Sequence, residues 1–121
     1  MPFDWGEFLN LARYLQGNST VAFSQEAGLR TAVSRAYYAA FCHAVEFARR
    51  NLGYRPTYDE EEHKEIRKHL AGKGRANIAD FLNDLRQWRN DCDYRPEVAN
   101  IQFYALHAIE RAEQVFAGLG R

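Results

Sequence analysis

The chain has 121 residues, of which 46% are hydrophobic and 14% aromatic, a composition that predicts one folded domain over residues 1–121. Lys and Arg together number 16, as do Asp and Glu, which excludes binding to nucleic acid or an anionic membrane through overall charge and leaves only local basic patches. There is no basic and apolar leader, no run of roughly 18 apolar residues and no disulfide pattern, so we expect a cytoplasmic protein without a membrane span.

Two helices are expected in the N-terminal half. Residues 4–17 begin with Asp4 as N-cap and Glu7 three residues later, which is an Asp variant of the capping box. A connector over 18–23 then leads to Ser24, a second candidate N-cap. The helix that follows extends to Gly53, and its apolar arc is broad, which predicts neighbours on more than one side.

Three further helices are expected over 58–72, 76–94 and 97–120. Thr57 and Glu60 form a candidate capping box for the first of them, and Pro96 stands where the first residue of the last helix would be. No segment alternates with the period of a strand. The predicted fold is therefore an all-α, antiparallel up-and-down bundle of four to five helices.

Arg89 interrupts the apolar pattern of the segment 76–94. At about 100° per residue it falls within the stripe formed by Leu82, Leu85 and Cys92. One interpretation is a buried arginine paired with a carboxylate across the bundle. The other is a cation that binds phosphate, with Asn90, Asp93 and Tyr94 within one helical turn of it.

The stretch "SRAYYAAFCHA" carries a second polar group. It contains Arg35 and Tyr38, and His43 falls inside the apolar arc, where a core histidine with a hydrogen-bond partner is the commoner case and a catalytic histidine the alternative. His63 and His69 are six residues apart, so they do not form a metal site on one helix face, and we expect no metal.

Basic residues also end the segment 58–72 and begin the loop after it. We interpret them as charges that complement the helix dipole and as solvated loop residues, with contact to a nucleic-acid backbone as the alternative. They are Arg67, Lys68, Lys73 and Arg75.

Three segments together resemble the HEPN family (higher eukaryotes and prokaryotes nucleotide-binding domain). They are "SRAYYAAF", "HKEIRKHL" and "LRQWRNDCDY", which occur in the family's order over roughly residues 25 to 115. The resemblance implies a helical bundle that pairs as a homodimer and needs no cofactor. It also implies RNA or a nucleotide as ligand and a nucleotidyltransferase-type partner protein, as in toxin–antitoxin systems.

The ribonucleases of this family place a histidine four to six residues after the arginine, and two copies form one metal-independent site. Arg89 and Asn90 match the arginine and the polar residue of that motif, but Tyr94, Arg95 and Pro96 follow, with Asp93 just before them. This is the Arg-Asn-x-x-Asp-Tyr variant of other branches.

The first hypothesis is therefore a dimeric module that binds RNA or a nucleotide. Arg89 and Asn90 would contact phosphate, Asp93 and Tyr94 would order the site, and the residues Arg35 and Tyr38 would line its edge. The alternatives are a ribonuclease in which His43 or His63 transfers the proton, and a purely structural domain.

Overall fold

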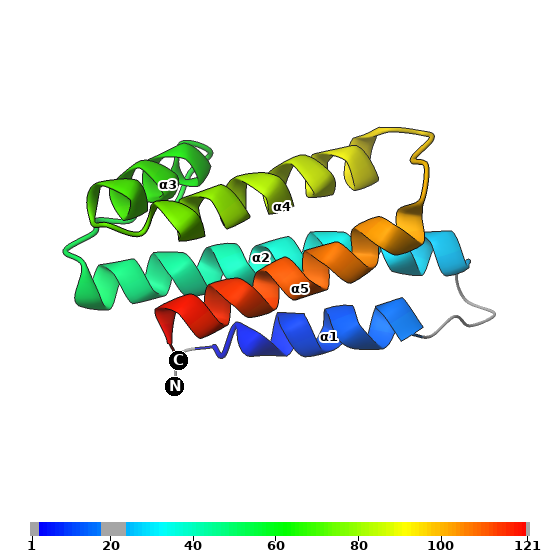
Figure 1. Ribbon diagram of the computed structural model, residues 1–121, viewed down its shortest axis with the longest axis horizontal. Coiled ribbons are helices and arrows are strands. Elements are labelled where there is room, and N and C mark those ends of the chain that lie inside the picture. Colours follow the sequence, from blue (N-terminus) through cyan, green and yellow to red (C-terminus); the bar gives the residue numbers. More distant parts are fainter. Residues whose placement is uncertain (1–2, 18–23, 121) are drawn as a thin grey trace.

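The computed structural model describes residues 3–17 and 24–120, so the connector expected over 18–23 lies outside the described residues. It contains the helices α1 (Gly6–Gly17), α2 (Gln25–Asn51), α3 (Glu62–Gly72), α4 (Ala76–Tyr94) and α5 (Ile101–Leu119). Helices α1, α2, α4 and α5 alternate in direction, and α3 lies beside α4 near the C-terminal end of α2 (Figure 1). The predicted all-α antiparallel bundle is confirmed.

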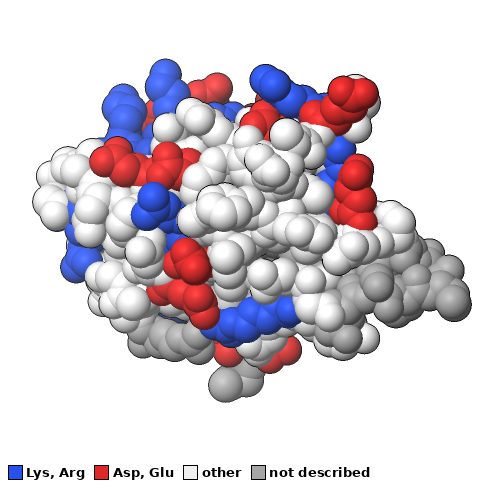
Figure 2. Space-filling view, turned by 45° about the vertical axis from the view of Figure 1, so that its right-hand side comes forward, with Lys and Arg blue, Asp and Glu red and all other residues white. Residues whose placement is uncertain are grey.

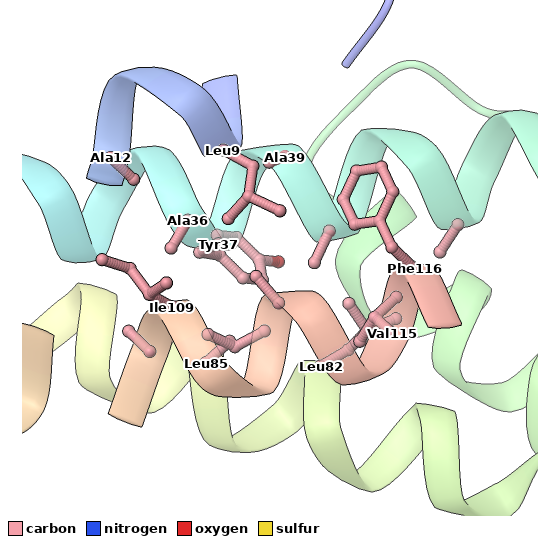
Figure 3. Packing of buried hydrophobic residues seen from close by; sticks show 14 of the residues in the cluster. Leu9, Ala12, Ala36, Tyr37, Ala39, Leu82, Leu85, Ile109, Val115 and Phe116 are labelled. Atoms are coloured by element: carbon pink, nitrogen blue, oxygen red, sulfur yellow. The ribbon is translucent and has the colours of Figure 1, made fainter. Parts of the chain in front are cut away.

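Helix α2 is the centre of the bundle and contacts each of the other four helices, as its broad apolar arc predicts. Side chains from α1, α2, α4 and α5 meet around Tyr37, which is 1% exposed (Figure 3). Alanine supplies much of the buried surface, and its small side chain lets helix backbones approach closely. Fully buried alanines are Ala12 of α1, Ala32, Ala36, Ala39, Ala40, Ala44 and Ala48 of α2, and Ala105, Ala108 and Ala112 of α5.

Asp4 and Ser24 cap α1 and α2 as the sequence predicts, but the Glu7 side chain makes no capping-box bond to the Asp4 N–H among the described residues. Asp4 Oδ1 accepts a hydrogen bond from the Gly6 N–H at 2.9 Å, and Ser24 Oγ accepts one from the Ala27 N–H at 3.1 Å. These bonds satisfy main-chain donors that have no partner within the first turn of a helix.

The predicted start of α3 is wrong, because the helix begins at Glu62 and not at residue 58. The carboxylate of Glu62, rather than that of Glu60, accepts from the Thr57 N–H at 3.1 Å and the Tyr58 N–H at 3.0 Å. Tyr58 has a φ of 55°, in the left-handed region, so a right-handed helix cannot pass through it. The chain therefore loops around a buried acceptor before α3 starts.

The predicted start of α5 is also wrong, since the helix begins at Ile101 and Pro96 is not its first residue. The guanidinium of Arg30, on α2, donates to three main-chain carbonyls between Cys92 and Pro96 at 2.6 to 3.1 Å. These bonds satisfy carbonyls at the end of α4 and hold the connector away from a helical path. Asn100, with a φ of 56°, reverses the chain just before α5.

Charges of both signs are interleaved on the surface. On the face in Figure 2, acidic and basic side chains lie beside one another around the rim, and uncharged residues cover the middle. Within residues 3–17 and 24–120, no helix is both long enough and apolar enough to cross a membrane.

Candidate functional site

Arg89 lies near the C-terminal end of α4, where the apolar stripe reaches the surface. Leu82, Leu85 and Cys92 of that stripe are buried, and the Arg89 side chain is 16% exposed. Its guanidinium carbon lies 5.2 Å from the ring centroid of Tyr38 on α2 and 5.6 Å from that of Tyr94. Two aromatic rings therefore cover the cation while leaving part of it open to solvent.

The polar partners of Arg89 come from its own helix. Nη1 donates to Asn90 Oδ1 at 3.0 Å, and Nε lies 2.8 Å from Asp93 Oδ2, one turn further along. The structural interpretation predicts a carboxylate partner from across the bundle. The carboxylate beside Arg89 instead comes from its own helix, so that prediction is wrong. The buried Nε–H is not directed at the Asp93 oxygen and has no hydrogen-bond acceptor among the described residues. Asp93 thus compensates the charge of the Arg89 guanidinium without accepting a hydrogen bond from its Nε–H.

Arg35 and Tyr38 extend this group along α2. The Arg35 guanidinium lies 5.1 Å from the Tyr38 ring centroid and 4.9 Å from that of Phe8 on α1. The Tyr38 ring therefore has a guanidinium near it on α2 and another on α4. All six residues predicted as the main site, from Arg35 to Tyr94, are brought into one connected group.

His63, in the first turn of α3, joins the same neighbourhood. Its ring centroid lies 6.4 Å from that of Tyr38 and 4.3 Å from that of Phe41, on which it stacks at 12°. Its Nδ1 is hydrogen bonded to the hydroxyl of Tyr37. It also lines a cleft of about 250 Å³ with Phe41 and Tyr58, so part of the ring can be reached from outside.

The bond to Tyr37 decides which nitrogen of His63 can donate. Burial raises the pKa of Tyr37 well above its usual value, so its hydroxyl keeps the proton. Nδ1 is the only hydrogen-bond partner that the described residues give this buried O–H, so the arrangement in which the hydroxyl donates and Nδ1 accepts is the one that leaves no buried donor without an acceptor. In the neutral ring the proton then lies on Nε2, which makes Nε2–H a donor for a ligand.

Burial lowers the pKa of His63, and the positive charges of Arg86, Arg89 and Arg67 lower it further. The ring is therefore neutral at neutral pH, in the form that the Tyr37 bond favours. A neutral N–H that feels the positive charge of three arginines can donate to a bound anion without first taking up a proton.

Lowering the pH from about 7 to about 5 is expected to destabilise the fold partly through His63. Its folded-state pKa lies below the ordinary value of about 6.5, so the unfolded chain binds the proton more readily. The contribution of His63 to the free energy of unfolding is complete above about pH 6.5, and it is lost as the pH falls towards the folded-state pKa of His63. The urea midpoint should therefore fall less between these pH values in His63→Gln than in the unchanged protein.

His107→Gln is the matched control for this measurement. His107 lies on α5, with Nδ1 3.6 Å from Glu110 Oε2 and the side chain 42% exposed. The urea midpoint of the His107→Gln variant should fall between these pH values nearly as much as that of the unchanged protein. An equal fall in His63→Gln and the unchanged protein would show that His63 does not titrate differently on folding.

His43 lies on α2, away from this group, and packs against the C-terminal end of α5. Its ring stacks on Phe116 with centroids 4.1 Å apart, and its Nε2 is 2.7 Å from the main-chain oxygen of Gly120. The hydrogen bond is the one that the commoner interpretation of the sequence expects, but His43 is half-buried and lines a cavity of about 570 Å³, so it is not a core residue. Of the two histidines named for proton transfer, only His63 is connected through Tyr38 to Arg89.

Sequence reasoning does not single out Arg86, and it interprets Arg67 as a charge that complements the helix dipole, with contact to a nucleic-acid backbone as the alternative. Arg67 follows His63 by one turn of α3, and Arg86 precedes Arg89 by one turn of α4, so each pair shares a helix face. Both arginines are half-buried. The helical periodicity of α4 could have identified Arg86, since this residue lies beside the apolar stripe. Only the packing of α3 on α4 brings Arg67 near Arg86.

Two further possibilities for the site are thiolate chemistry and a metal ion. Burial raises the pKa of Cys42 and of Cys92 to about 11, so both remain thiols at neutral pH. Among residues 3–17 and 24–120, no three His, Cys, Asp or Glu side chains are grouped so that they could hold a metal ion.

No family model, curated protein or solved structure matches this chain significantly. The arrangement of Arg89, His63 and their neighbours is therefore interpreted from its own geometry.

Proposed function

We propose that this chain is a HEPN-like module that binds RNA or a nucleotide through a phosphate group held by Arg89. The observation that carries the proposal is the state of the Arg89 guanidinium. Nη1 is fixed by Asn90, while Nη2 donates to none of the described residues. The guanidinium is already held in one orientation and still has a free N–H donor. It can therefore bind a phosphate oxygen with little further loss of side-chain conformational entropy.

The surrounding residues take supporting roles in this proposal. Asn90 and Asp93 fix the orientation of the guanidinium through the contacts described above. Tyr94 is 72% exposed and offers a ring on which a base can stack, and Arg35 and Tyr38 bound the site on the side of α2.

The proposal includes a homodimer and a nucleotidyltransferase-type partner protein, as the resemblance implies. Large exposed apolar side chains on α5 supply surface that a second copy would cover: Phe103 and Leu106 are 63% and 43% exposed. Sedimentation that shows a monomer at every concentration would contradict the dimer.

The variant Arg89→Ala tests the binding function. We expect the affinity for a single-stranded oligoribonucleotide to fall about 10- to 100-fold, since a hydrogen bond to a charged group contributes about 1.5–3 kcal/mol. The slope of log affinity against log salt should also decrease by about 0.7 for the lost phosphate contact. Fluorescence anisotropy at several salt concentrations measures both.

The control is Arg13→Ala, which removes the same charge from an exposed pair with Glu113 on the other side of the bundle. It should change affinity by less than about twofold. Folding of both variants is checked by circular dichroism. If the unchanged protein binds no RNA or nucleotide, the proposal fails. If Arg89→Leu raises stability without changing binding, Arg89 is only a structural residue.

A ribonuclease is the second candidate, with His63 as the proton-transfer group. The observation that favours it is the connection of His63 through the Tyr38 ring to Arg89. The Nε2–H of the neutral ring can donate a hydrogen bond but cannot transfer its proton, so His63 would protonate a leaving oxygen only in its imidazolium form. Degradation of RNA that is lost in both Arg89→Ala and His63→Gln would establish this activity.

A further inference from the structure

Arg67 and Arg86 are the half-buried arginines that have no ion pair, hydrogen bond or ring contact with any described residue. Their charges are therefore partly removed from water without a counter-charge. Arg35, which is also half-buried and has no ion pair or hydrogen bond with the described residues, lies over the rings of Phe8 and Tyr38. Seven other arginines lie within 4 Å of a carboxylate oxygen: Arg13, Arg30, Arg49, Arg50, Arg89, Arg95 and Arg111.

Helix geometry places the two arginines around the Tyr37–His63 pair. Arg67 lies one turn after His63 on α3, and Arg86 lies one turn before Arg89 on α4. The Tyr38 ring contacts both His63 and Arg89, which joins these two helix faces. The cations thus come from two helices and converge beside one aromatic pair.

Electrostatics agree with this placement. Burial lowers the pKa of Arg67, and the charge of Arg86 lowers it further, so the two guanidiniums repel one another.

Glu46, Asp59 and Glu62 line the cleft beside His63, and each carboxylate has partners of its own. Glu46 pairs with Arg49 and Arg50, and Asp59 accepts from the Thr57 hydroxyl and the Glu61 N–H. Glu62 accepts from Tyr54 and two main-chain N–H groups, and Asp93 lies against Arg89.

We propose that Arg67, Arg86 and the Nε2–H of His63 form a binding site for a phosphate monoester, the terminal phosphate of an RNA or a nucleotide. A dianion would neutralise both uncompensated guanidiniums, whereas a phosphodiester carries one charge and would leave one of them unbalanced. Arginine also binds phosphate oxygens in a bidentate manner, and His63 adds a neutral donor.

This inference rests on the proposed function and narrows it. Arg89 would contact a phosphate within the chain of the nucleic acid, while the Arg67–Arg86 pair would recognise its end. The two sites adjoin through Tyr38, so one ligand can occupy both.

The test compares one short oligoribonucleotide in three forms: without terminal phosphates, with a 5′-phosphate and with a 3′-phosphate. Isothermal titration or anisotropy should show that one phosphorylated form binds about tenfold more tightly than the unphosphorylated one. Arg67→Gln and Arg86→Gln should each reduce this ratio to about one, while the unphosphorylated form binds nearly as before. Arg50→Gln, which removes an exposed cation paired with Glu46, should leave the ratio unchanged.

Equal affinity for all three forms in the unchanged protein would overturn the inference. So would a ratio that survives in both Arg67→Gln and Arg86→Gln, with folding confirmed by circular dichroism for at least one of them. Arg89→Ala separates the two proposals, since it should weaken all three forms by a similar factor. If no oligonucleotide binds, the proposed function fails; adenosine monophosphate compared with adenosine then tests the monoester site, which an absence of binding by both would refute.

Discussion

Replacement of Glu62 by alanine is expected to lower the free energy of unfolding by about 3 kcal/mol, because it leaves several buried donors without an acceptor. Glu62 is 3% exposed and accepts from the Tyr54 hydroxyl and from the N–H groups of Thr57 and Tyr58. Burial, and then the bond to Glu62, raises the pKa of Tyr54 well above its usual value, so this donor stays protonated.

The neighbouring Glu61→Ala is the matched control. Glu61 is exposed and its carboxylate makes no contact with a described residue, so its loss should change stability by less than about 0.5 kcal/mol. Urea unfolding measures both variants. A difference between them of less than about 1 kcal/mol would mean that the loop around Glu62 does not depend on this carboxylate.

Glu62 also bears on function, because it fixes the start of α3. His63 is the next residue, and Arg67 lies on the same helix. Any fraction of Glu62→Ala that remains folded should therefore bind RNA more weakly if α3 shifts, although Glu62 itself contacts no ligand in the proposed site.

The variant Leu85→Ala is expected to destabilise the protein by about 3 kcal/mol, within the range of about 2 to 5 kcal/mol for removal of a buried leucine side chain. Leu85 is 0% exposed and lies on α4 at the interface with its neighbours (Figure 3). The loss combines the transfer of apolar surface to water with the cavity that remains.

Leu106→Ala removes the same atoms from a position that is 43% exposed on α5. It should cost less than about 1 kcal/mol, and the comparison by urea unfolding isolates the effect of burial. Similar losses in the two variants would indicate that the core around α4 closes up after truncation, or that Leu106 is covered by a second copy. Repeating the measurement over a range of protein concentrations separates these two outcomes.

Much of the fold follows from local sequence signals. The caps at Asp4 and Ser24 and the limits of α4 can be predicted because they depend on residues close together in the chain. The starts of α3 and α5 could not be predicted. They depend on the buried Glu62 acceptor and on Arg30, which reaches the carbonyls after Cys92 from another helix.

The same distinction explains the candidate site. Arg89, Asn90, Asp93 and Tyr94 could be grouped from sequence because one turn of α4 contains them. The link to His63 and the convergence of Arg67 with Arg86 depend on how α3 packs on α4 and α2. Helical periodicity gives the face of each helix, but it does not give that packing.

The alanines that line the interior have a thermodynamic consequence. An alanine side chain has no rotamers to lose on folding, so the contacts that these alanines make between α2 and its neighbours cost almost no side-chain conformational entropy. If a larger residue replaces one of these alanines, none of its rotamers fits the space between the helices, and the helices must move apart. The helix that carries Tyr37 and Tyr38 is thus held by backbone proximity, and it forms a rigid reference against which the arginines of α3 and α4 are positioned.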